Sequence, residues 1–450
     1  MALGELGLVA WEFDRDRERA LELYGRAISI AREIGVPLLQ ATWLNNAGNV
    51  FRDTGNHAAA LDHYRQALAL DQRRGARRDP FPLKNIGQVL AALGRVREAE
   101  RFLFEAVAAA DSQNIAKIRW QSRMELGDLY RDVAPVRADQ HYRESLDVLE
   151  ANQSSVLLEG FRAGLLGGAL GRYDPYDRYI RFLLERGDGA GAFAVAERAR
   201  ARVFLESLTF ARAELAAAVP PDYLQAETEL LRQISSSQRE LRAASMPGHQ
   251  RRALLDRITG AEDALTTLRL RLAADRPAVA DARFPRLWSL DEVRERVLDP
   301  DEALAMFFLG RDASTAWIVD RSGTHVVALP ARRDIEQAVN RLLPTLQSPA
   351  ATVDEEARAW LSRTLVAPVV ARVPEGAHLV VVPHAILNYL PFELLADEKG
   401  RYLIERNTIS YAPSVSSLAY LRQRPVQPRA ATVLAVGSPA TQAATRATER

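Results

Sequence analysis

Few residues of this sequence are placed to carry out covalent chemistry. The 450 residues contain no cysteine, which excludes a thiol nucleophile, a disulfide and a thiolate metal ligand from this chain. Ser414, Ser416 and Ser417 follow a proline without a G-x-S-x-G elbow, so we interpret them as caps at the start of a helix. The Gly-Ser-Pro segment at 437–439 lacks the G-K-[ST] of a phosphate loop, and nucleotide binding is not expected.

The histidines are the next candidates for catalysis or metal binding. His384 follows an apolar run at 379–382 that is closed by Pro383, and we interpret it as a turn residue that caps the end of a strand. His325 and His378 lie beside apolar runs and have no sequence neighbours at metal-ligand spacing, so we interpret them as structural or surface histidines. We expect no metal and no other cofactor.

Composition limits the partners and the compartment. The chain is 48% hydrophobic and 26% charged, as is usual for globular proteins with two or three domains. Its 59 basic and 58 acidic residues give a net charge of +1, which favours neither nucleic acid nor anionic membrane as a partner. The sequence has no apolar run of about 18 residues, and its N-terminus lacks a basic leader region, so we expect a cytoplasmic protein.

A repeat of about forty residues organises the N-terminal third. Its small and large positions recur as Ala20, Tyr24 and Ala27, then Ala60, Tyr64 and Ala67, then Ala99, Leu103 and Ala106, and finally Ala138, Tyr142 and Ser145. Gly48, Gly87 and Gly127 hold the small position of the preceding helix. Small residues let two antiparallel helices approach closely, and the large residue fills the gap to the next pair. The pattern resembles tetratricopeptide repeats over roughly residues 1–150 and predicts an α-solenoid.

Helices and then strands follow the repeats. Residues 155–210 keep helical spacing, and Pro220-Pro221 breaks the chain. Residues 223–273 form two helical stretches around AASMPGHQ, which predicts a coiled-coil-like helical hairpin. From Ala303 onward, ALAMFFL, TAWIVD and THVVAL predict strands, the last two joined by a hairpin turn. Helical periodicity returns at 332–346 and 354–370.

Three ordered segments near the C-terminus resemble a known family. They are VPHAILNYLPFELL, RYLIERN and YAPSVSSL, and they are similar to the opening of a CHAT domain, a caspase-like domain usually fused to tetratricopeptide repeats. AFAVAERARARVFLESL at 192–208 resembles the helix that commonly precedes this domain. The residues themselves predict strands at 379–382, closed by Pro383, and at 408–411, followed by Pro413. The segment at 432–436 resembles the first core strand of the caspase-like sheet. The predicted fold is thus mainly α, a tetratricopeptide-repeat solenoid followed by an α/β region that resembles the first part of a CHAT domain.

The same resemblance bears on activity. The family's catalytic His and Cys occur in later "ATHG"-like and "SACxTG"-like segments, and neither segment occurs in this sequence. We therefore expect the chain to end before an active site and to have no peptidase activity of its own. We predict no catalytic residues in this chain.

The remaining candidate is the inner face of the repeats, where a few positions of each first helix commonly line the groove of this architecture. Asn and Gln side chains can pair with the backbone of an extended peptide, and Lys and Arg with a carboxylate. A polar stripe also serves solubility, so a merely solvated face is the competing interpretation. The predicted peptide-binding positions are Thr42, Asn45, Asn49, Arg52, Lys84, Gln88, Gln121, Asp128 and Arg131.

Two functions are compatible with these observations. The first is a protein-interaction scaffold that recruits a protein or peptide partner through the repeats and carries an incomplete CHAT domain. The second is the N-terminal portion of a caspase-like cysteine peptidase whose His and Cys lie beyond residue 450. We favour the first. The corresponding domains are repeats at 1–150, further repeat-like helices at 151–219, a helical hairpin at 220–280 and a partial CHAT domain at 281–450.

Overall fold

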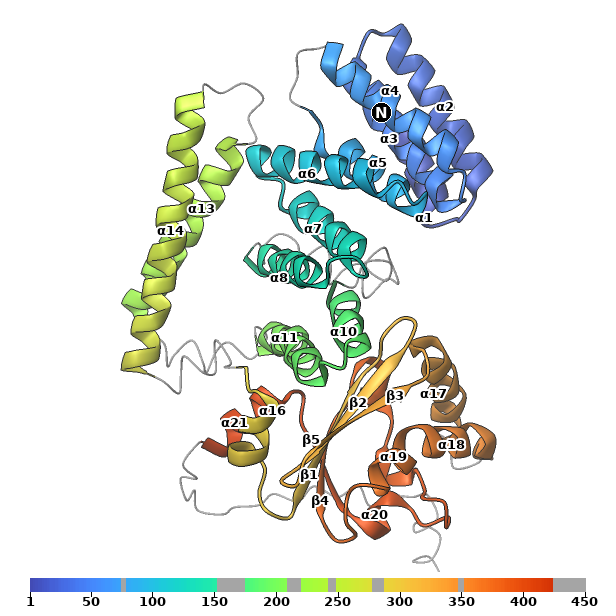
Figure 1. Cartoon of the computed structure of the whole chain (residues 1–450), viewed down its shortest axis with the longest axis vertical. Coiled ribbons are helices and arrows are strands. Elements are labelled where there is room, and N and C mark those ends of the chain that lie inside the picture. The colour runs from blue at the N-terminus through green and yellow to red at the C-terminus, as the bar shows by residue number, and fades with distance from the viewer. Residues whose placement is uncertain are drawn as a thin grey trace, which may run out of the picture.

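The computed structural model describes residues 1–73, 78–151, 175–208, 220–241, 248–276, 287–346 and 352–423. The predicted strand at 432–436 lies outside these ranges. Helical hairpins stack one on the next in the N-terminal part (Figure 1), which confirms the predicted solenoid. Their helices are α1 (Ala2–Glu12), α2 (Arg17–Glu33), α3 (Pro37–Asp53), α4 (His57–Arg73), α5 (Pro80–Ala92), α6 (Val96–Gln113), α7 (Ala116–Tyr130) and α8 (Pro135–Ala151).

Local sequence explains where these helices begin and end. Proline occupies the first turn of α3 and α5, where its fixed φ suits a helix and its missing amide is not needed. Asp79 caps α5 by accepting a hydrogen bond from the Phe81 amide at 2.9 Å. Gly55 and Gly94 follow α3 and α5 at φ of +79° and +71°, which glycine adopts without strain. The chain can therefore turn tightly into the second helix of each hairpin.

Two more helical units follow. Helices α10 (Pro175–Glu185) and α11 (Gly189–Leu208) continue the stack beneath α8 (Figure 1). Helices α13 (Pro221–Leu241) and α14 (Gly248–Asp275) form the predicted hairpin, which stands beside the array. Within the described residues, no helix combines the length and the apolar character needed to cross a membrane.

The C-terminal part contains a mixed five-stranded sheet of order β3-β2-β1-β4-β5. Strands β1 and β2 and strands β2 and β3 pair antiparallel, whereas β1 and β4 and β4 and β5 pair parallel. The register places Leu304 opposite Val380, which in turn lies opposite Ser410. The strands are β1 (Glu302–Phe308), β2 (Ser314–Asp320), β3 (Thr324–Leu329), β4 (His378–Val382) and β5 (Thr408–Tyr411), so the strands predicted within the described residues are confirmed.

Alternate residues of the central strands point into two separate cores. On β1, Leu304, Met306 and Phe308 belong to a core that continues into the repeats, and Phe307 belongs to the core on the opposite face. This alternation follows from the two-residue period of a strand. Helices on one face include α10, α11, α16 (Leu290–Glu292) and α21 (Val415–Gln423); those on the other are α17 (Arg332–Leu346), α18 (Glu355–Leu361), α19 (Ala367–Val370) and α20 (Leu403–Arg406).

Two buried charged side chains of α11, Glu197 and Arg200, form hydrogen bonds that link the helical array to the sheet and to α21. The Glu197 carboxylate accepts hydrogen bonds from the amides of Val415 and Ser416 at 3.1 and 3.2 Å. The Arg200 guanidinium donates to the carbonyl of Pro383 at 2.5 Å and to that of Phe307. Burial raises the pKa of Glu197 and lowers the pKa of Arg200 to about 10, because both charged forms lose solvation.

Candidate functional site

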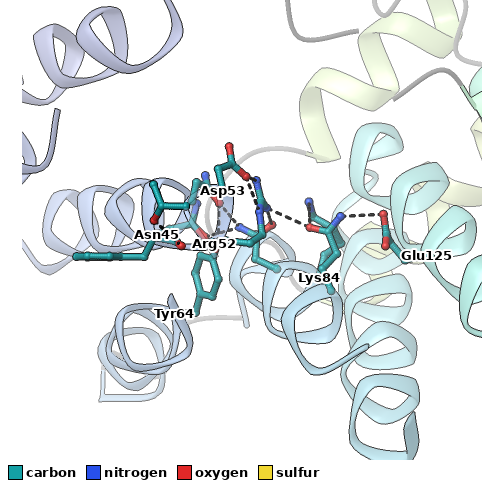
Figure 2. A network of polar contacts seen from close by, with 11 residues as sticks. Asn45, Arg52, Asp53, Tyr64, Lys84 and Glu125 are labelled. Atoms are coloured by element: carbon teal, nitrogen blue, oxygen red, sulfur yellow. Dashed lines mark hydrogen bonds and ion pairs between the residues drawn. The ribbon is translucent and has the colours of Figure 1, made fainter. Parts of the chain in front are cut away.

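Side chains from successive first helices meet on the inner face of the repeats (Figure 2). The Asn85 amide on α5 donates to the side-chain oxygens of Asn45 and Asn49 on α3, at 2.9 and 3.0 Å. Asn85 is only 3% exposed. Because a buried amide without partners would cost free energy, these bonds fix the spacing of α3 and α5.

Arg52 and Lys84 extend this set toward α7. The Arg52 guanidinium donates to the Gln88 side-chain oxygen at 3.1 Å and forms an ion pair with Asp53 at 2.9 Å. The Lys84 amine donates to the same Gln88 oxygen at 3.2 Å. The side chains of Arg52 and Lys84 therefore converge on one neutral amide.

The chain of contacts then continues through α7 to α10. The Gln88 amide donates to Glu125 at 2.8 Å. Arg178 on α10 forms ion pairs with Glu125 at 3.2 Å and with Asp128 at 2.6 Å. We call the whole set the inner-face network; its members are Asn45, Asn49, Arg52, Asp53, Lys84, Asn85, Gln88, Glu125, Asp128 and Arg178.

Two tyrosines at the large position of the repeat form hydrogen bonds to network residues. The Tyr64 hydroxyl donates to Asn49 at 2.8 Å, and the Tyr142 hydroxyl donates to Asp128 at 2.7 Å. Both rings are fully buried, and both recur at the large position of the repeat. The residues that set the helix packing thus also hold the rotamers of the inner-face side chains.

Burial changes the ionisation of two network residues. Desolvation, followed by the charge of Arg52, lowers the pKa of Lys84 to about 7. Burial also raises the pKa of Asp128, against the opposing ion pair with Arg178. Lys84 is 6% exposed, so its amine can change charge near neutral pH.

The structure brings most of the predicted binding residues together. Asn45, Asn49, Arg52, Lys84, Gln88 and Asp128 all belong to the network. Three others do not. The exposed Thr42 hydroxyl donates to the Leu38 carbonyl at 2.9 Å, Gln121 is buried, and Arg131 forms an ion pair with Glu185.

Sequence reasoning missed four members of the network, namely Asn85, Glu125, Asp53 and Arg178. The forty-residue period contains the signal for the first two, because Asn45, Asn85 and Glu125 follow one another at intervals of forty. Arg178 lies 53 residues after Glu125, so the period could not have found it. These residues join the side chains of the inner face into one network of contacts.

The histidines and serines at the sheet have structural partners. His384 accepts a hydrogen bond from the Leu309 amide at 3.0 Å and stacks on Phe308 with ring centroids 4.8 Å apart. Burial lowers the pKa of His384 well below its usual value, so the ring is neutral. His378 contacts the Ser410 hydroxyl at 2.8 Å.

The interpretation as a helix cap agrees with the geometry for Ser414 only, because Ser416 and Ser417 lie inside α21 and the Ser416 hydroxyl donates to Glu197. The Ser414 hydroxyl accepts from the Ser417 amide at 3.0 Å at the start of α21. In the part of the chain that the structure describes, no three metal-ligating side chains gather at one point.

Family models match both ends of the chain. A tetratricopeptide repeat model matches residues 1–73, and a CHAT domain model matches residues 355–449. The chain therefore contains tetratricopeptide repeats and a CHAT domain. The CHAT match begins at α18 and includes β4, β5 and α21, whereas β1, β2, β3 and α17 precede it. Both cores of the sheet therefore contain residues from inside and from outside the matched segment.

Solved structures similar to this TPR–CHAT chain are distant in sequence. A putative kinesin light chain of Podosopora anserina with nearly identical TPR-like repeats is 16% identical, covers 44% of this chain and 92% of its own, and has a TM-score of 0.33. The apo form of RapI is 13% identical, with 62% and 88% coverage and a TM-score of 0.34. A tetratricopeptide repeat protein from Parabacteroides merdae is 18% identical, with 57% and 98% coverage and a TM-score of 0.27. None of the curated proteins matches the sequence.

Proposed function

We propose that this chain is a protein-interaction scaffold whose inner-face network binds a segment of a protein partner. The continuity of the network carries the proposal, because hydrogen bonds and ion pairs join side chains of α3, α5, α7 and α10 in one line. An extended segment lying across these helices would meet amide, cationic and anionic groups in turn. Such groups can pair with peptide backbone and with charged side chains.

Preorganisation favours binding over mere solvation. The side chains of Arg52 and Arg178 are 19% exposed, that of Glu125 is 11% exposed and that of Asp128 is 35% exposed. They therefore retain surface for a ligand while their mutual bonds hold their rotamers. A ligand then loses less free energy to side-chain ordering when it binds.

The competing interpretation is that the network only holds successive repeats together. Both roles predict some loss of stability when the network is cut, so stability alone does not separate them. Only the binding role predicts a loss of affinity in variants that remain folded.

The test is a double substitution measured against a partner identified by pull-down. Asn49→Ala with Lys84→Ala should weaken that partner's affinity about ten-fold or more, because one lost hydrogen bond to a charged group costs roughly 1.5 to 3 kcal/mol. Calorimetry would give the affinity, and circular dichroism would verify folding. Arg101→Ala on α6, whose side chain is 63% exposed, is the matched control and should bind like the wild type. Unchanged affinity in the folded double variant would refute the proposed binding face.

The CHAT domain favours a second candidate function, a part in caspase-like peptidase chemistry. A thiol for that chemistry would have to come from outside these 450 residues, which contain no cysteine. This candidate does not compete with partner binding by the repeats, since the repeats would then recruit a substrate or a trigger.

A further inference from the structure

One edge of the five-stranded sheet is open. Strand β3 pairs with β2 on one side, and no other strand of the described residues pairs with its outer side. The backbone N–H and C=O groups of Asp320 and Gly323 bond each other across the β2–β3 turn. Because hydrogen-bonded pairs alternate with non-bonded pairs in an antiparallel ladder, every second residue of β3 bonds to β2. These residues are His325, Val327 and Leu329.

The residues between them turn their backbone groups outward. Thr324, Val326 and Ala328 therefore each present an N–H donor and a C=O acceptor along the open edge. No backbone group in the described parts of the chain bonds to these donors and acceptors. Val326 is 44% exposed and Ala328 is exposed as well, so a second strand can reach the edge from solvent.

Strand β3 also lacks the features that usually keep an edge from pairing. Natural edge strands are protected by charged side chains, by proline or by a bulge. The strand reads THVVAL, without proline, lysine, arginine or an acidic residue, and its register with β2 is continuous from Thr324 to Leu329. With a net charge of +1, two copies of the chain repel each other little.

We propose that β3 is a dimerisation edge, on which two copies of the chain pair their β3 strands antiparallel about a two-fold axis at Val326. In this register Val326 lies opposite its own counterpart, and Thr324 lies opposite Ala328 of the second copy. Every outward donor and acceptor of both strands then has a partner, and the two sheets become one.

The spacing of the outward groups selects a second copy as the occupant. One outward residue lies on each side of Val326 at the same distance along the strand, so the edge is complementary to itself under a two-fold rotation. Registers centred on either neighbour, His325 or Val327, leave one of the three outward residues without a partner. The inference goes beyond the proposed function and does not depend on it.

The absence of cysteine from the chain makes cross-linking a direct test of this register. Facing residues of a hydrogen-bonded antiparallel pair have Cα atoms about 5.5 Å apart, within the range of a disulfide. Val326→Cys should therefore form a covalent dimer under mild oxidation. Thr324→Cys alone should not, because its two copies would lie about 14 Å apart along the strands. Thr324→Cys mixed with Ala328→Cys should give a covalent mixed dimer.

Sedimentation of the full-length chain measures the association itself. Val326→Pro removes an outward N–H and leaves the bonds to β2 in place, and edge strands tolerate proline at such a position. It should weaken dimerisation about ten-fold or more, because the two-fold axis removes two hydrogen bonds at once. Ala328→Lys, which puts a charge on the edge, should also weaken it.

The matched control is Thr408→Lys on β5, the strand at the opposite end of the sheet order, where Thr408 is exposed. This variant should dimerise like the wild type. Circular dichroism verifies the fold of each variant, and the cross-linking test needs no change to the backbone of β3.

Three results would overturn the inference. The first is a chain that stays monomeric at high concentration and gives no Val326→Cys dimer. The second is equal cross-linking of Thr324→Cys and Val326→Cys, or a dimer that Val326→Pro leaves intact. The third is a monomeric chain whose pulled-down partner is lost in folded Val326→Pro, which would assign the edge to a strand of that partner.

Discussion

At the residue scale, glycines decide how closely the repeat helices pack. A Cβ atom on Gly48 would lie 2.6 Å from the Tyr64 ring, and one on Gly127 would lie 2.6 Å from the Tyr142 ring. Gly87 stands in the same relation to Leu103. The structure adds a fourth pair, because a Cβ on Gly7 would lie 2.9 Å from Tyr24. The two helices of each hairpin can therefore pack this closely because the glycine has no Cβ atom.

Gly48→Ala should therefore destabilise the array by about 1–3 kcal/mol, the usual cost of overpacking a core. Urea unfolding followed by circular dichroism measures the loss. Gly25→Ala is the matched control, because Gly25 is an exposed residue within helix α2 and has nothing within 4 Å of its Cβ position. It should be neutral or stabilise by up to about 1 kcal/mol. Equal effects of the two substitutions would contradict this packing role.

The sequence predicts some of the residue contacts in the repeats and not others. The repeat of Gly48 and Tyr64 along the chain predicts their contact, since both positions recur with one period. Hydrogen-bond partners across helices depend on register between repeats, which the period predicts for Asn85 and Glu125 but not for Arg178. The burial of Lys84 had no sequence signal at all, because a lysine on a polar stripe is ordinarily exposed.

At the element scale, α11 belongs physically to both halves of the chain. The sequence predicts it as a helix that resembles the one commonly preceding a CHAT domain, and charged residues are rarely fully buried. Instead Glu197 is fully buried and Arg200 is 5% exposed, because each finds backbone partners at the ends of strands or at the start of α21. The sequence of one helix does not show which distant backbone groups its charged side chains will contact. The predicted domain boundaries stay predictions.

Arg200→Met should destabilise the docking of α11 on the sheet by about 3–5 kcal/mol. The change removes the donor to the carbonyls of Phe307 and Pro383 and leaves the nearby Glu197 charge uncompensated in a buried place. The comparison is Arg198→Met on the same helix, which pairs with Glu150 at 2.7 Å with a side chain 22% exposed.

Thermal and urea unfolding of the two variants would be compared directly. The Arg198 variant should lose about 1 kcal/mol or less, as partly exposed ion pairs usually do. If both variants lost the same stability, the special role of Arg200 would be wrong.

At the scale of the whole molecule, one apolar core runs from the repeats to the sheet. It includes Tyr142 of α8, Phe193 of α11 and Trp317 of β2, whose indole also donates to the Gly189 carbonyl at 2.9 Å. Ring centroids of Phe193 and Trp317 lie 6.0 Å apart. The inner-face network ends at Arg178 on α10, which packs in the same core region. A partner held by the network would therefore lie on the same packed body as the CHAT sheet.

The most direct test of the account is hydrogen exchange of the full chain with and without the partner identified by pull-down. Binding across the inner face should slow exchange in α3, α5, α7 and α10, because these helices carry the network and local opening would have to break the new contacts. The hairpin of α13 and α14, which contributes no network residue, should be unchanged and serves as the internal control. Protection confined to that hairpin or to the CHAT sheet, with none in α3, α5 or α7, would contradict the central claim that the inner face of the repeats is the binding surface.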